Sequence, residues 1–120
     1  MFEAEIERGA ELLDKDDPGW ALESAKRSID LRALNMGSTK RCILGQRGGD
    51  YADELIRLSE WKNNPYPDWL GLHELSASCG FSLDSKLGYR TLEKEWRAFI
   101  RKRRKDATLA LSETKGRKKP

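Results

Sequence analysis

The sequence predicts an all-α protein, and three observations support that prediction. Valine is absent, and isoleucine and threonine are few; because β-branched residues favour strands, their scarcity argues against a sheet. Strict alternation of apolar and polar residues, the mark of a half-buried strand, is hard to find over any long stretch. Apolar residues recur instead at spacings of three and four, the period of an amphipathic helix. We therefore expect a single compact domain of about five to six short helices, with a long C-terminal helix and a basic tail.

The chain length sets the domain organisation. A chain of 120 residues allows one domain, since domains commonly hold about 100–150 residues. We place the helical domain at 1–105 and the basic tail at 106–120. No apolar run approaches the roughly 20 residues that a membrane helix needs, and the N-terminus lacks the basic and apolar regions of a secretory signal. We therefore expect a cytoplasmic protein with no membrane partner.

The first part of the chain predicts short helices separated by turns. The first helix is expected over residues 2–14, whose apolar face holds Phe2, Ile6, Ala10 and Leu13. A second helix is expected over 18–27, with Asp17 as its cap and Pro18 in its first position. Residues 29–36 predict a single helical turn capped by Asp30.

A glycine-rich stretch follows. Ser38 is expected to cap a short helix through residues 41–46, which Gly48 and Gly49 end. Asp50 is expected to cap the next helix, whose inward residues are Tyr51, Leu55 and Leu58. The glycines do not form a phosphate-binding loop of the Walker type, because the required lysine and hydroxyl residue do not follow the last glycine.

The remaining chain predicts a proline-containing loop and two helices. The loop covers 61–68, and a helix over 69–79 is expected to end at Gly80 in the left-handed conformation. The last helix is the best defined, and its apolar face is formed by Tyr89, Leu92, Trp96, Phe99 and Ile100. From about Asp106 this period is lost, and the chain is expected to continue as the tail.

The net charge of +3 conceals an uneven distribution. Residues 1–96 carry 13 basic and 18 acidic side chains (net −5), whereas residues 97–120 carry 10 basic and 2 acidic ones (net +8). Such a split is typical of a basic arm on an acidic body. The partner of the arm is nucleic acid, an acidic protein surface or the protein's own acidic body.

Two groups of residues are candidates for contacting a partner. The basic candidates for nucleic-acid or protein contacts are Arg97, Arg101, Lys102, Arg103, Arg104, Lys105, Lys115, Arg117, Lys118 and Lys119. Such a cluster can neutralise several phosphates; alternatively, its cations complement the dipole at a helix C-terminus and the tail aids solubility. The second group is a candidate aromatic patch in and after the proline loop, formed by Trp61, Tyr66 and Trp69.

Candidate catalytic and metal-binding residues are few. The chain has one histidine, His73, and two cysteines, Cys42 and Cys79, whereas a structural zinc site needs four ligands, usually in closely spaced pairs. We therefore expect no metal and no cofactor, and both cysteines buried and reduced. A cysteine–histidine nucleophilic pair would place one of these cysteines beside His73, and no local sequence pattern supports it.

The acidic residues form clusters that match no calcium-binding loop. They are expected to lie on solvated faces or to cap helices. The clustered residues are Asp14, Asp16, Asp17, Asp50, Asp53 and Glu54.

Several short motifs occur in order between Arg8 and Arg101. They are RGAxLLD at 8–14, PGW at 18–20, IDLxxLxM at 29–36, CILGQ at 42–46, GDY at 49–51, GF at 80–81 and YxxLxxxW at 89–96. In these motifs the chain resembles a family of small uncharacterised proteins of actinobacteria and their phages. One departure is that Arg47 and Gly48 stand where this family usually has one or two bulky residues. The resemblance implies no activity; it implies a phage-encoded accessory protein in the cytoplasm of a bacterial host.

We therefore expect a non-enzymatic binding protein, a phage-encoded accessory or host-modulating factor that acts through protein–protein contacts with a host protein. The alternative is a nucleic-acid-binding protein that uses the basic C-terminal helix and tail. A third possibility is an enzyme that depends on Cys42 or His73.

Overall fold

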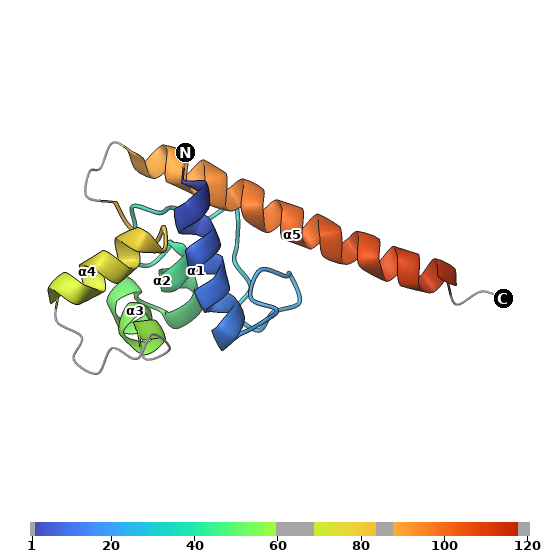
Figure 1. Ribbon diagram of the computed structural model, residues 1–120, viewed down its shortest axis with the longest axis horizontal. Helices are drawn as coiled ribbons and strands as arrows, with labels where there is room; N and C mark the ends of the chain where they lie inside the picture. The colour runs from blue at the N-terminus through green and yellow to red at the C-terminus, as the bar shows by residue number, and fades with distance from the viewer. Residues whose placement is uncertain (1, 60–68, 84–87, 118–120) are drawn as a thin grey trace.

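A computed structural model describes residues 2–59, 69–83 and 88–117, and its account of side chains covers 2–59, 71–83 and 88–110. These residues form helices and no strand, which confirms the predicted all-α class. The helices are α1 (Glu3–Asp16), α2 (Ile43–Gly48), α3 (Tyr51–Ser59), α4 (Trp69–Ser78) and α5 (Tyr89–Arg117). The first four helices form a body, and α5 runs along this body and projects well beyond it (Figure 1).

The core lies beneath the first half of α5 and is centred on Trp96, which is 0% exposed. The Trp96 ring stacks on Phe81 with centroids 5.9 Å apart and meets the Trp20 ring edge-on at 6.1 Å. Its Nε1 donates a hydrogen bond to the carbonyl of Gly80 at 2.6 Å. The apolar faces predicted for the helices do point inward, and their buried members are Ile6, Ala10, Leu13, Leu55, Leu58, Leu92, Trp96 and Ile100.

A glycine lets α1 approach this core closely. A Cβ atom at Gly9 would lie 2.1 Å from the backbone oxygen of Cys79 and 3.1 Å from the ring of Trp96. Real Cβ atoms do not come this close to other atoms, because packing in the interior is already dense. The absence of a side chain at this position therefore sets how near α1 lies to the end of α4 and to α5.

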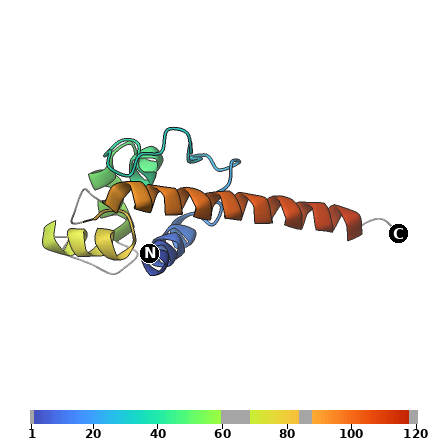
Figure 2. The ribbon, with the colours of Figure 1, turned by 90° about the horizontal axis from the view of Figure 1, so that it is seen from above.

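The segment between α1 and α2 is not helical, so the prediction of a helix over 18–27 was wrong. Its backbone forms successive tight turns instead: the N–H of Leu22 donates to the carbonyl of Gly19, and that of Ala25 to Leu22. Because each bond spans three residues rather than four, the chain turns repeatedly and no α-helix starts. Asp30 does begin a turn, with its carboxylate accepting from the N–H of Arg32 at 3.0 Å, but the predicted helical turn over 29–36 is absent. Figure 2 shows this segment as irregular chain beside α5.

Side chains of α5 supply the hydrogen-bond partners that this irregular segment lacks. Arg97 and Arg104 donate to its backbone, and the accepting carbonyls are those of Leu31, Leu34, Ala21 and Ile29. The N–H of Met36 donates to the Glu93 carboxylate at 3.1 Å. Because buried backbone groups need partners, these long side chains allow an irregular segment to cover part of the core.

The residues predicted to end or cap helices do so in most cases, but α2 begins later in the chain than predicted. The helix expected over 41–46 begins later, at Ile43, and its cap is Cys42 rather than the predicted Ser38. The Cys42 sulfur accepts from the N–H of Gly45 at 3.3 Å. Gly49 ends α2 at φ 85°, and Gly80 follows α4 at φ 71°, both in the left-handed region that favours glycine. Asp50 caps α3 as predicted, since its carboxylate accepts from the N–H of Ala52 at 3.1 Å.

The last helix continues further than its apolar period suggested. Residues 106–117, which we assigned to the tail, extend α5 to Arg117. Ala107 and Thr108 still border the irregular segment, whereas the helix beyond them projects away from the body (Figure 1). The apolar period therefore marked where α5 packs on the body, not where it ends.

Candidate functional site

The basic residues of α5 divide into two groups according to the side of the helix on which they lie. Arg97, Arg103 and Arg104 are partly buried against the body, whereas Arg101, Lys102 and Lys105 are exposed. The sequence placed all of these residues in one candidate contact cluster. The structure therefore separates side chains that stabilise the fold from side chains that can meet a partner.

Arg103 pairs with the protein's own acidic body. Its guanidinium forms two hydrogen bonds with the Asp14 carboxylate, at 2.6 and 3.0 Å. The same guanidinium lies 4.9 Å from the ring centroid of Phe99 and 5.9 Å from that of Trp20. Trp20 in turn donates from Nε1 to Asp14 at 2.9 Å. Arg103 thus covers the aromatic core, and its charge is compensated within the chain.

Arg97 and Arg104 are also engaged within the chain. Arg97 donates at 3.1 Å to each of two carbonyls of the irregular segment and lies 3.5 Å from the Glu93 carboxylate. Arg104 donates to two further carbonyls of that segment at 2.9 and 2.7 Å. Each of these arginines therefore holds α5 against the body, a role that a spacing pattern alone does not show.

The solvent side of α5 carries a row of cations that we call the cationic face: Arg90, Lys94, Arg101 and Lys105. Successive members are four, seven and four residues apart, so they share one stripe of the helix. At 1.5 Å per residue the row is about 22 Å long. Lys102, also exposed, lies at its edge, where it lines a groove together with Glu3 and Glu7 of α1.

The cations of this face are not compensated. Within the residues that the structure describes, none of them forms an ion pair or a side-chain hydrogen bond. Besides Lys102, the exposed residues between them are Thr91 and Ala98, whose side chains are small. The nearby carboxylates of α5 are used elsewhere, since Glu93 accepts from Met36 and Glu95 accepts from the N–H of Phe2 at 3.0 Å. The row itself therefore contains no acid, although Glu3, Glu7 and Glu95 line the groove at its edge beside Ala98, and the exposed Asp106 follows Lys105.

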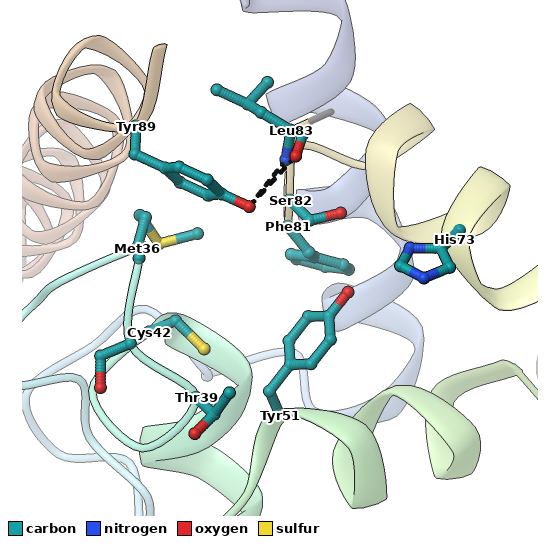
Figure 3. Close-up of a pocket in the computed structure, with 11 residues that line it drawn as sticks. Met36, Thr39, Cys42, Tyr51, His73, Phe81, Ser82, Leu83 and Tyr89 are labelled. Carbon is teal, nitrogen blue, oxygen red and sulfur yellow. Dashed lines mark hydrogen bonds between the residues drawn. The ribbon is translucent and has the colours of Figure 1, made fainter. Parts of the chain in front are cut away.

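A pocket of about 170 Å³ brings together two residues singled out for catalysis, Cys42 and His73. In Figure 3 the ring of Tyr51 lies between the Cys42 sulfur and the imidazole. Burial raises the pKa of the Cys42 thiol, although the N–H of Gly45 partly offsets this. Because the thiolate is the reactive form of cysteine, the raised pKa makes this sulfur less reactive, and its structural role is that of a helix cap.

The hydroxyl groups around this pocket bind one another. The Tyr51 hydroxyl is hydrogen-bonded to that of Ser76, which donates to Ser82 at 2.7 Å. Across the pocket, the Tyr89 hydroxyl accepts from the N–H of Leu83 at 3.1 Å (Figure 3). In the described part of the chain, no group of three or more histidine, cysteine or acidic side chains is placed to hold a metal ion. These contacts stabilise the junction of α3, α4 and α5.

A second cluster of charges is buried where α1, α2 and α3 meet. Arg47, whose side chain is 2% exposed, lies 2.6 Å from Asp16 and 3.2 Å from Glu54. Arg57 contacts the same two carboxylates at 2.6 and 2.7 Å, and its hydrogen bonds to Asp16 and then to Glu54 raise its pKa. The prediction that these acids lie on solvated faces was therefore wrong for Asp16 and Glu54. We call these four residues the buried ion network.

Comparison of the chain with protein-family models, curated proteins and solved structures gave no match. The resemblance to the actinobacterial and phage family therefore stays a prediction. In the described part of the chain, no helix combines the length and the apolar character needed to cross a bilayer. The candidate site is therefore assigned only from the geometry and the charges of the described residues.

Sequence reasoning missed two members of the cationic face, Arg90 and Lys94. Arg97, Arg101 and Arg104 are four and three residues apart, as on one stripe of a helix, but that stripe is rotated toward the body. The signal was present in the predicted apolar face: residues opposite Leu92 and Trp96 on the helix must face solvent. Counting back from Lys105 and Arg101 by helical turns leads to Lys94 and Arg90.

Several other candidates cannot be placed. Lys115 and Arg117 belong to α5, but the description of side chains does not reach them. Lys118 and Lys119 lie outside the described residues. The aromatic patch also stays a prediction. Trp69 begins α4 without a described side chain, and Trp61 and Tyr66 lie outside the described residues.

Proposed function

We propose that the protein binds nucleic acid by placing the cationic face of α5 along a phosphate backbone. One observation carries this proposal: in the described part of α5, exposed and unpaired cations form a row about 22 Å long that itself contains no acid. Phosphate contacts from lysine and arginine supply most of the sequence-independent affinity of such proteins, because they release condensed counterions. The alternative raised by the sequence thus becomes the leading function.

The charge of the body favours one orientation of the bound protein. Residues 1–96 carry a net charge of −5, although this range includes Arg90 and Lys94 of the cationic face. A polyanion is repelled by the acidic surface and attracted to the cationic face, so the field directs the encounter. Because the row lies on a helix supported by the core as far as Arg104, binding needs no rearrangement of the body.

Removing the charge of the cationic face should greatly weaken binding. We expect the variant Arg90→Gln, Lys94→Gln, Arg101→Gln and Lys105→Gln to lose most affinity for a 20-base-pair duplex, measured by fluorescence anisotropy. For the wild type, about four phosphate contacts predict an affinity that falls on the order of 100-fold between 50 and 200 mM salt. For the variant we expect a clearly shallower salt response, because only Lys102 and the distal cations of the chain remain.

A matched control removes the same charge elsewhere. The residues Lys15, Lys26, Arg32 and Arg41 are exposed and lie outside α5, and replacing all four by glutamine should leave the salt slope close to that of the wild type. A flat salt response of the wild type, or equal losses in the two variants, would contradict the proposal.

The expected protein partner remains a second candidate, favoured by the projecting end of α5. Leu109 is 51% exposed, and this end of the helix lies away from the body in both views (Figures 1 and 2). A truncation after Thr108 separates the two candidates, since it keeps the cationic face and removes the projecting end. Salt-dependent duplex binding through the cationic face should persist, although the loss of Lys115, Arg117, Lys118 and Lys119 lowers the affinity. Binding of a protein partner through this end would be lost.

A further inference from the structure

We infer that the nucleic acid held by the cationic face is double-stranded, an inference that rests on the proposed function. It depends on three features of α5: the rigid spacing of its cations, the placement of its aromatic rings and the small side chains between its charges. Each feature distinguishes a stiff duplex from a flexible single strand.

The first feature is the fixed spacing of the charges. The helical rise places Arg90 and Lys94 about 6 Å apart along the axis, and Lys94 and Arg101 about 10 Å apart. A duplex is stiff over about 150 base pairs, so its phosphates meet a rigid row of cations without being ordered first. A single strand loses conformational freedom when it is held along such a row, and phosphate contacts alone must offset that loss.

The second feature is that the aromatic rings of α5 are not available to bases. Proteins that bind single strands stack bases on exposed rings, which stabilises binding by about 1–3 kcal/mol per base. Trp96 is 0% exposed. Phe99 stacks on Trp20 with centroids 6.5 Å apart, and Arg103 covers it. Tyr89 binds the backbone of Leu83. In the described part of the chain, the cationic face therefore offers no stacking platform.

The third feature is the shape of the surface between the charges. Thr91 and Ala98 are exposed on the solvent side of α5 between these charges and are small. Small side chains let the helix approach a backbone closely, and they add no large group that would wedge between bases. A row of about 22 Å corresponds to about six to seven base pairs at 3.4 Å each.

The inference is tested by comparing a 20-base-pair DNA duplex with a 20-nucleotide oligo-dT strand in fluorescence anisotropy at equal salt. We expect the wild type to bind the duplex at least tenfold more tightly. In a series of 4, 8 and 12 base pairs, affinity should rise steeply up to about 8 and little beyond. The glutamine variant of the cationic face should lose this preference, and the control variant outside α5 should keep it.

The possible failures are distinguishable. Equal affinity for both probes, or tighter binding of oligo-dT, overturns the inference and leaves the proposed function intact. Absence of salt-dependent binding to either probe overturns the proposed function itself. A preference for the duplex that survives in the glutamine variant overturns the assignment of the duplex to the cationic face.

Discussion

Replacement of Trp96 by alanine is expected to lower the free energy of unfolding by about 3–5 kcal/mol, the usual cost of truncating a buried aromatic residue. Trp96 is 0% exposed and contacts the rings of Phe81, Trp20 and Phe99. The change also leaves the carbonyl of Gly80 without its donor. Since small domains are stable by about 5–15 kcal/mol, the loss should be evident in urea denaturation followed by circular dichroism.

Two further variants define the origin of this loss. Trp96→Phe keeps an aromatic ring but removes the hydrogen bond to Gly80, so it should cost about 1–3 kcal/mol. Lys94→Ala, on the solvent side of the same helix, should change stability by less than about 0.5 kcal/mol. If Trp96→Ala were as mild as Lys94→Ala, Trp96 would not belong to the core, and the assignment of the inward face of α5 would be wrong.

The sequence predicted those parts of the fold that depend on local periodicity and on helix-end residues. The spacing of Leu92, Trp96 and Ile100 identified both the last helix and its buried side. Gly80 and Asp50 marked the end of one helix and the start of another, because each acts on the backbone within a few residues. Such features can be predicted from one sequence, since the residue that begins or ends a helix lies within a few positions of the backbone it affects.

The predictions failed where the partner of a residue lies far away in the chain. Residues 18–27 have helical caps, yet they form turns, and the carbonyl of Ala21 in these turns accepts a hydrogen bond from Arg104, 83 positions away. Asp16 looked like a solvated acid, because its partner Arg47 is 31 positions away. For the same reason, the sequence predicted only Arg101 and Lys105 of the cationic face. Only the fold shows that the Arg97 side chain turns inward whereas that of Lys94 does not.

Replacement of Arg47 by methionine is expected to lower the free energy of unfolding by about 3 kcal/mol, because it leaves buried carboxylates with one cation fewer. The side chain of Glu54 is 1% exposed and that of Asp16 is 11% exposed. Arg57, which is 40% exposed, keeps its contacts with both acids but cannot fill the space that the Arg47 guanidinium occupies. Arg41→Met, an exposed position just before α2, is the matched control and should change stability by less than about 0.5 kcal/mol.

A double-mutant cycle shows whether the loss arises from the buried ion network or from packing. Glu54→Gln removes one carboxylate charge, so it relieves part of the imbalance that Arg47→Met creates. If charge is the cause, the double variant should be more stable than the sum of the single changes predicts, by about 1–3 kcal/mol. If packing is the cause, the two effects should simply add. Additive losses in chemical denaturation would therefore show that Arg47 stabilises the junction of α1, α2 and α3 through the volume it fills, because a pairing role requires coupling to Glu54.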